Sequence, residues 1–104
     1  MTTANLVVNA PLTRKSELLW TWHDGYQFDG ILNEAIKKTK FQRFTLSGLN
    51  NLITKHCDFE KANSNDGRGD WSWSLTILDE KHAVLTGAGC GEVKTKWLDL
   101  SEVE

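Results

Sequence analysis

Cysteine is scarce in this chain, and its scarcity removes two classes of protein. The 104 residues contain two cysteines, Cys57 and Cys90, which lie far apart and outside any C-x-x-C pair. Small secreted domains carry more cysteines, joined in a disulfide framework. We therefore expect two thiols, no zinc motif built on paired cysteines, and a cytoplasmic location.

Long hydrophobic runs are also lacking. No apolar stretch approaches the roughly 20 residues that span a bilayer, so no membrane partner is expected. Residues 1–6 have neither the basic nor the long apolar region of a signal peptide. The length and the 39% hydrophobic content are typical of one globular domain, residues 1–104.

The whole chain has no large excess of positive or negative charge, but each half of it does. The net charge is −2. Residues 1–55 carry seven basic and four acidic side chains, whereas residues 56–104 carry five basic and ten acidic ones. Such asymmetry can steer a charged partner or align two copies of the chain. A two-fold dimer could lay the acidic half of one copy against the basic half of the other.

The most regular pattern lies between residues 71 and 100. Trp71, Trp73, Leu75 and Ile77 alternate with Ser72, Ser74 and Thr76, which is the period of a strand with one buried face. A polar turn at 79–82, an apolar run at 83–86, a glycine-rich segment at 87–91 and a further alternation at 93–98 follow. The region predicts a three-stranded antiparallel meander.

The first 28 residues are less regular. Residues 6–8 predict a short strand that ends at Pro11. Residues 13–28 fit either a helix from Thr13 to Gly25 or a hairpin that turns at 23–25. The alternation of Trp20 and Trp22 favours the strand.

Two helices are expected in the middle of the chain. Asp29 is the expected N-cap of the first, which ends near Thr39 or Lys40 and has an apolar face of Ile31, Leu32, Ala35 and Ile36. Thr45 is the expected N-cap of the second, with Leu46, Leu49, Leu52, Ile53 and Cys57 on one side. A polar surface loop covers residues 60–70. The predicted fold is therefore α+β, with a largely antiparallel sheet and two helices packed on one of its faces.

Enzymatic and metal chemistry find little support. The glycine-rich segment is followed by a strand pattern and not by the helix that a phosphate loop needs. Cys90 could act as a nucleophile with His82 or His23 as its base, but most single cysteines are structural. His56, Cys57, His82 and Cys90 have the atoms for zinc but not the spacing. We assign no catalytic residue, no metal and no cofactor.

Nucleic acid is not an expected partner either. Lys37, Lys38, Lys40 and Arg43 are interleaved with Phe41 and Phe44, which could follow a phosphate backbone and stack a base. However, phenylalanines that flank two helices usually pack them on a sheet, and the acidic second half would repel phosphate.

Tryptophan is the one abundant feature, with five residues. Two helices cover only part of such a sheet, and an uncovered face that carries tryptophan is a binding surface. The expected function is a non-catalytic interaction protein that engages a protein partner or a second copy of itself. The expected binding residues are Trp20, Trp22, Trp71, Trp73 and Trp97. The alternative is a small-molecule ligand, bound in an aromatic-lined pocket between the sheet and the helices.

Overall fold

The computed structural model describes residues 3–22, 24–62 and 69–102. Its strands are β1 (Ala4–Ala10), β2 (Lys15–Thr21), β3 (Glu60–Lys61), β4 (Trp71–Ile77), β5 (His82–Gly89) and β6 (Glu92–Asp99). Its helices are α1 (Phe28–Thr39) and α2 (Leu46–His56). Short 3₁₀ turns occupy Pro11–Thr13, Gly25–Gln27 and Leu100–Glu102.

The six strands form one sheet in the order β3-β2-β1-β4-β5-β6. All neighbours are antiparallel except the central pair, β1 and β4, which run parallel with Leu6 opposite Trp73. The predicted α+β class and the C-terminal meander β4–β5–β6 are confirmed. The parallel central pair makes the sheet mixed, a small departure from the expected pattern.

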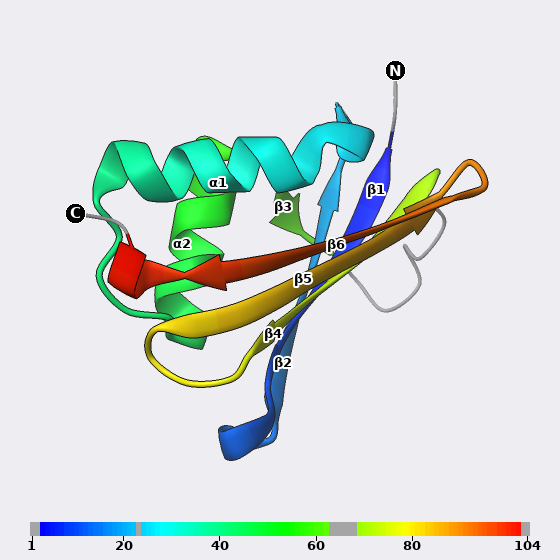
Figure 1. Cartoon of the computed structure of the whole chain (residues 1–104). Coiled ribbons are helices and arrows are strands. Elements are labelled where there is room, and N and C mark those ends of the chain that lie inside the picture. The colour runs from blue at the N-terminus through cyan, green and yellow to red at the C-terminus, as the bar shows by residue number, and fades with distance from the viewer. Residues whose placement is uncertain (1–2, 23, 63–68, 103–104) are drawn as a thin grey trace.

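Both helices lie on the same side of the sheet (Figure 1). Alternate residues of β1 and β4 face the helices and are buried, whereas the residues between them are not. Aromatic rings fill the space between sheet and helices: Phe28 lies 4.7 Å from Phe59 and 5.6 Å from Trp73, measured between ring centroids. Such close, tilted contacts are typical of a well-packed core.

Trp71 and Trp73 lie over glycines of β5. The two indole rings are stacked with centroids 5.4 Å apart, opposite Gly89 and Gly87 in the neighbouring strand. A Cβ atom at Gly87 would come within 2.3 Å of the Trp73 ring, and one at Gly89 within 2.5 Å of Trp71. The glycines therefore leave room for tryptophan. The indole nitrogen of Trp73 donates a buried hydrogen bond to the carbonyl of Gly25.

Residues 13–28 contain the strand that the sequence favoured, but not the expected return strand. The partner of β2 is the preceding strand β1, and Gly25–Gln27 form a 3₁₀ turn that leads into α1. The expected N-cap Asp29 is also wrong, because α1 begins at Phe28 and Gln27 holds the cap position. Phe28 packs in the core, and this contact extends the helix to include it. Asp29 instead lies in the first turn, where a carboxylate interacts favourably with the helix dipole.

The remaining helix predictions are confirmed. The hydroxyl of Thr45 accepts a hydrogen bond from the backbone N–H of Gly48, at 3.1 Å, and so caps α2. Helix α1 ends at Thr39, and Lys40 follows in a left-handed conformation. Both helices bury the apolar faces expected of them.

The predicted loop at 60–70 is only partly visible. Its first residues form β3, a two-residue strand opposite Leu19 and Trp20, and residues 63–68 lie outside the described part of the chain. Within the described residues, no helix has both the length and the apolar character that crossing a membrane requires.

Candidate interaction face

The face of the sheet turned away from the helices is the candidate site, and we call it the open face. It is built by the alternate residues of each strand that do not enter the core, because successive side chains of a strand point to opposite sides. The strand register places the following residues there: Asn5, Val7, Asn9, Ser16, Leu18, Trp20, Ser72, Ser74, Thr76, Val84, Thr86, Ala88, Val93, Thr95 and Trp97.

No charged side chain occurs among these residues. Exposed faces of sheets normally carry lysine and glutamate, which keep a protein soluble and discourage unwanted contacts. Within the described residues, charge reaches the open face only at its margins, through Glu60 in β3 and through the pair His82 and Asp99 at one corner. The interior of the open face presents hydroxyl, amide and apolar groups alone.

The five predicted binding tryptophans do not share a face. Trp20, Trp22 and Trp97 belong to the open face, whereas Trp71 and Trp73 are buried beneath the helices. The alternation of β4 shows why: all apolar residues of this strand face the core, so its outer positions are Ser72, Ser74 and Thr76. A surface contact can therefore reach only three of the five.

Trp20 and Trp22 form one corner of the open face. Their rings meet edge to face, with centroids 5.3 Å apart, and Trp22 is 53% exposed. The indole nitrogen of Trp22 donates to a carboxylate oxygen of Glu60 at 3.3 Å. The indole nitrogen of Trp20 is buried and has no acceptor among the described residues. The corner is therefore an aromatic pair in which the hydrogen bond to Glu60 fixes the Trp22 ring.

Trp97 lies at the diagonally opposite corner. It is 58% exposed, and Val93, four residues before it on the same face of β6, is 79% exposed. Strands β1, β4 and β5 separate β6 from β2, a span of roughly 19 Å at the usual strand spacing. The structure therefore does not bring Trp97 together with Trp20 and Trp22.

Beside Trp97 lies a small charged cluster, which we call the His82 cluster: His82, Asp79 and Asp99. The Nδ1 atom of His82 is 2.8 Å from Oδ1 of Asp79, and its Nε2 atom is 3.5 Å from Oδ1 of Asp99. The hydrogen bond to Asp79, aided by the charges of both carboxylates, raises the pKa of His82. The pKa of Asp79 is lowered, first by the backbone N–H of Lys81, and that of Asp99 by the hydroxyl of Ser101.

Most of the open face carries no tryptophan, so the tryptophan pattern of the sequence does not reveal it. Leu18, Val7 and Val84 contribute apolar surface, and serines, threonines and asparagines fill the area between the two corners. The signal that could have found them was present, since the residues alternating with the buried ones are uncharged in every long strand up to Ala88. Outward residues of ordinary exposed sheets contain lysine and glutamate at these positions.

The residues considered for catalysis and zinc are dispersed. Cys90 and His82 occupy opposite ends of β5, roughly 25 Å apart along the strand, and His23 lies outside the described residues. Cys57 is buried, which raises its pKa to about 12, with Asp58 adding to the effect. Among the residues that the structure describes, no three His, Cys, Asp or Glu side chains are grouped as a metal site would require.

The basic side chains considered for nucleic acid lie on the helical side of the molecule. Lys37, Lys38, Lys40 and Arg43 are exposed there, and Arg43 is 3.6 Å from Glu80. Phe44 is buried and Phe41 packs against the core, with their ring centroids 6.0 Å apart. The two rings therefore join the helices to the sheet and do not form a stacking platform.

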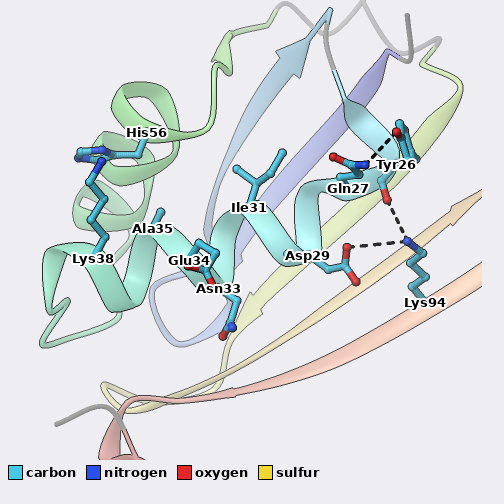
Figure 2. Close-up of a pocket in the computed structure, with 11 residues that line it drawn as sticks. Tyr26, Gln27, Asp29, Ile31, Asn33, Glu34, Ala35, Lys38, His56 and Lys94 are labelled. Carbon is cyan, nitrogen blue, oxygen red and sulfur yellow. Dashed lines mark hydrogen bonds and ion pairs between the residues drawn. The ribbon is translucent and has the colours of Figure 1, made fainter.

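Hollows lie around the helices. One of about 790 Å³ runs beside α1, between Tyr26, Lys38, His56 and Lys94 (Figure 2). Near its mouth, Lys94 is 3.8 Å from Asp29 and donates to the carbonyl of Tyr26 at 3.0 Å. Its walls combine the polar groups of Gln27, Asp29, Asn33, Glu34, Lys38, His56 and Lys94 with apolar surface of Ile31 and Ala35. Phe28, Phe59 and Trp73 pack against one another in the core and do not line it.

Comparison with family models, with curated proteins and with solved structures finds no match to this chain.

Proposed function

We propose that this protein is a non-catalytic interaction protein that binds a protein partner, or a second copy of itself, through the open face. The observation that supports this most is the absence of charge from the interior of that face within the described residues. A charged residue loses its hydration when a partner covers it, so the central parts of protein interfaces are depleted of charge.

The aromatic corners fit the same role. Exposed tryptophan is enriched among the residues that contribute most to binding, and here Trp22 and Trp97 stand at the two ends of an uncharged field. Hydroxyl and amide groups between them can exchange hydrogen bonds with a partner. A nucleic acid would need basic residues on this face, and none of the open-face residues is basic.

The experiment places a charge in the middle of the face. Thr86→Lys changes an exposed residue of β5, a central strand, and Asn51→Lys is the matched control on the exposed side of α2. Partners retained by the immobilised protein, and self-association measured by analytical ultracentrifugation, are compared for the three chains. We expect Thr86→Lys to weaken partner binding, and any self-association that stacks two open faces, at least tenfold, about 1.4 kcal/mol, and Asn51→Lys to leave both unchanged.

Equal behaviour of the two variants would contradict the proposal, because binding would then not involve the open face. Circular dichroism of each variant separates a binding defect from a folding defect. The lysine in Thr86→Lys extends into solvent, so the fold should tolerate it within about 0.5 kcal/mol.

The alternative, a small-ligand binder, has its support in the hollow beside α1. Its volume lies in the range of ligand sites, and it offers a carboxylate, a lysine and an imidazole. A polar, charged small molecule fits such walls better than the apolar one that an aromatic pocket would select. Ligand-induced stabilisation that is lost in Lys94→Ala, but kept in Thr86→Lys, would favour this alternative.

A further inference from the structure

Strand β6 is a long sheet edge. It lies at one end of the strand order and has eight residues, whereas the opposite edge is formed by β3, which has two. No strand among the described residues pairs with its outer side. Proteins usually protect such an edge by shortening it, by a bulge, by proline or by outward charges, since it presents unpaired N–H and C=O groups.

The backbone groups that point outward can be identified from the turn that precedes β6. Cys90 and Gly91 both have positive φ, 51° and 79°, and join Gly89 to Glu92 as a two-residue hairpin loop. The residues flanking such a loop exchange hydrogen bonds with each other, and along the strands this pattern alternates. The outward N–H and C=O groups of β6 therefore belong to Val93, Thr95, Trp97 and, at its end, Asp99.

Val93, Thr95 and Trp97 place their side chains on the open face and are uncharged, whereas the carboxylate of Asp99 lies beside His82 at the end of the strand. Val93 and Trp97 are the most exposed apolar residues of that face at β6. An outward-facing strand with this composition lacks the usual protection against pairing.

The lysines of β6 do not replace that protection. Lys94 points inward: it lies 3.8 Å from Asp29, donates to the carbonyl of Tyr26, and its Nζ atom is 5.3 Å from the Trp71 ring centroid (Figure 2). Lys96 is half-buried on the helical side of the strand. Neither side chain stands across the outer edge.

We propose that β6 pairs antiparallel with β6 of a second copy, about a two-fold axis at Thr95. In this register Thr95 faces its own counterpart, and Val93 of each copy faces Trp97 of the other. About six backbone hydrogen bonds form, because Val93, Thr95 and Trp97 of each strand meet one another. A symmetric interface makes each contact twice, so the apolar pair is also doubled.

Other registers fit less well. A shift by one residue would place side chains of opposite faces against each other. A shift by two residues in one direction places Val93 opposite Asp99, and in the other direction leaves Trp97 without a strand residue opposite it. The register centred on Thr95 places both Val93–Trp97 pairs apolar against apolar, with the two threonines between them.

This dimer goes beyond the proposed function, since it uses the edge of the sheet and not its face, and either proposal can fail alone. It would join two sheets into one continuous sheet. The two open faces would then lie side by side as a single surface, charged among the described residues only at Glu60, His82 and Asp99 of each copy, and available to a further protein.

Cross-linking tests the register directly. With Cys90→Ser as background, Thr95→Cys would bring two Cα atoms to about 5.5 Å, within the range of a disulfide. Val93→Cys is the matched control, because its two copies would lie roughly 14 Å apart across the same interface. Under mild oxidation we expect the covalent dimer to form at least tenfold faster in the Thr95→Cys chain. Equal rates, or none, would overturn the register.

Sedimentation over a wide range of protein concentration tests the edge itself. Thr95→Pro removes the outward N–H without touching the hydrogen bonds to β5, so we expect at least a tenfold weaker dimer. Thr86→Lys, in β5 and so one strand inward from the edge, should leave dimerisation intact. A monomer at every concentration overturns the edge dimer and leaves the open-face proposal standing.

A dimer that survives Thr95→Pro but not Thr86→Lys would mean that two open faces stack, which overturns the edge and supports the proposed function. Pairing with a peptide of another protein, while the chain itself stays monomeric, also overturns the second copy as the occupant. If Thr95→Pro fails to fold by circular dichroism, the cross-linking comparison still decides the question.

Discussion

Gly87 is needed because it has no side chain. The Trp73 ring occupies the space that any Cβ atom would take, and the ring is itself fixed by its hydrogen bond to Gly25 and its contact with Phe28. A larger residue cannot be accommodated by a small movement of the ring, because the core around it is filled.

Gly87→Ala should therefore lower the free energy of unfolding by about 1–3 kcal/mol, the usual cost of overpacking a core. Gly30→Ala is the control, since a Cβ atom at this exposed position of α1 meets nothing within 4 Å. It should be neutral or should stabilise the helix by up to about 1 kcal/mol. Chemical denaturation of both variants checks this, and a Gly87→Ala protein as stable as the wild type would contradict the packing argument.

At the scale of elements, the turn between β4 and β5 joins three parts of the chain. The carbonyl of Glu80 accepts from the N–H of Phe44, and the carbonyl of Lys81 accepts from the N–H of Leu100. The His82 cluster adds a protonation-dependent link between this turn and the end of β6. The turn therefore holds the start of α2 and the end of the meander together.

The His82 cluster makes stability depend on pH in a defined direction. Because the folded protein raises the pKa of His82, its contribution is complete below the ordinary histidine pKa and is lost as pH rises through the raised value. Asp79 and Asp99 have lowered pKa values, so their contribution is present above the ordinary carboxyl pKa and is lost in more acidic solution. The cluster stabilises most between about pH 4 and 6.5.

We expect the free energy of unfolding to fall between pH 6 and pH 8, and to fall less in His82→Gln. Denaturation curves at several pH values, recorded for both proteins, isolate the cluster from all other titrating groups. Asp99→Asn should give an intermediate result, since Asp79 remains. Parallel curves for wild type and His82→Gln would exclude the cluster as a contributor.

The pattern of neighbouring residues in the sequence could predict those helices and strands that have one buried face. The alternation of β4 and the Thr45 cap of α2 depend on neighbours in sequence, and both were predicted. The choice of partner for β2 and the parallel pairing of β1 with β4 depend on packing across the sheet, which alternation does not encode. The start of α1 was misplaced for a related reason, since the position of Phe28 is set by Phe59 and Trp73. The open face was only half visible, because the sequence shows where tryptophans stand but not which of them the helices cover.

For the whole molecule, the uneven charge of the two halves does not coincide with the open face. The acidic residues of the meander lie at its turns and margins, at Asp79, Glu80, Glu92 and Asp99. Most basic residues of the first half lie on the helices or between them, at Lys37, Lys38, Lys40, Arg43 and Lys55. An association that uses the open face or the β6 edge should therefore change little with ionic strength, since screening acts on exposed charges.

Light scattering at low and high salt measures this. We expect the dissociation constant of any self-association to change less than about threefold between the two conditions. A tenfold change would correspond to a difference of about 1.4 kcal/mol in binding free energy. A large loss of association at high salt would instead favour a dimer that aligns the acidic half of one copy with the basic half of the other. Lys38→Ala would then weaken it, whereas Thr95→Pro would not.

The division of the tryptophans between two faces gives the protein two optical populations. Trp71 and Trp73 are sealed in the core, so their emission reports only whether the chain is folded. Trp22 and Trp97 meet solvent, and Trp97 also lies 5.8 Å from the His82 ring, whose protonated form quenches indole fluorescence. Anything that covers the open face shields these indoles from a dissolved quencher while the core pair stays unchanged. The accessibility of the tryptophans to a quencher therefore reports whether the open face is occupied.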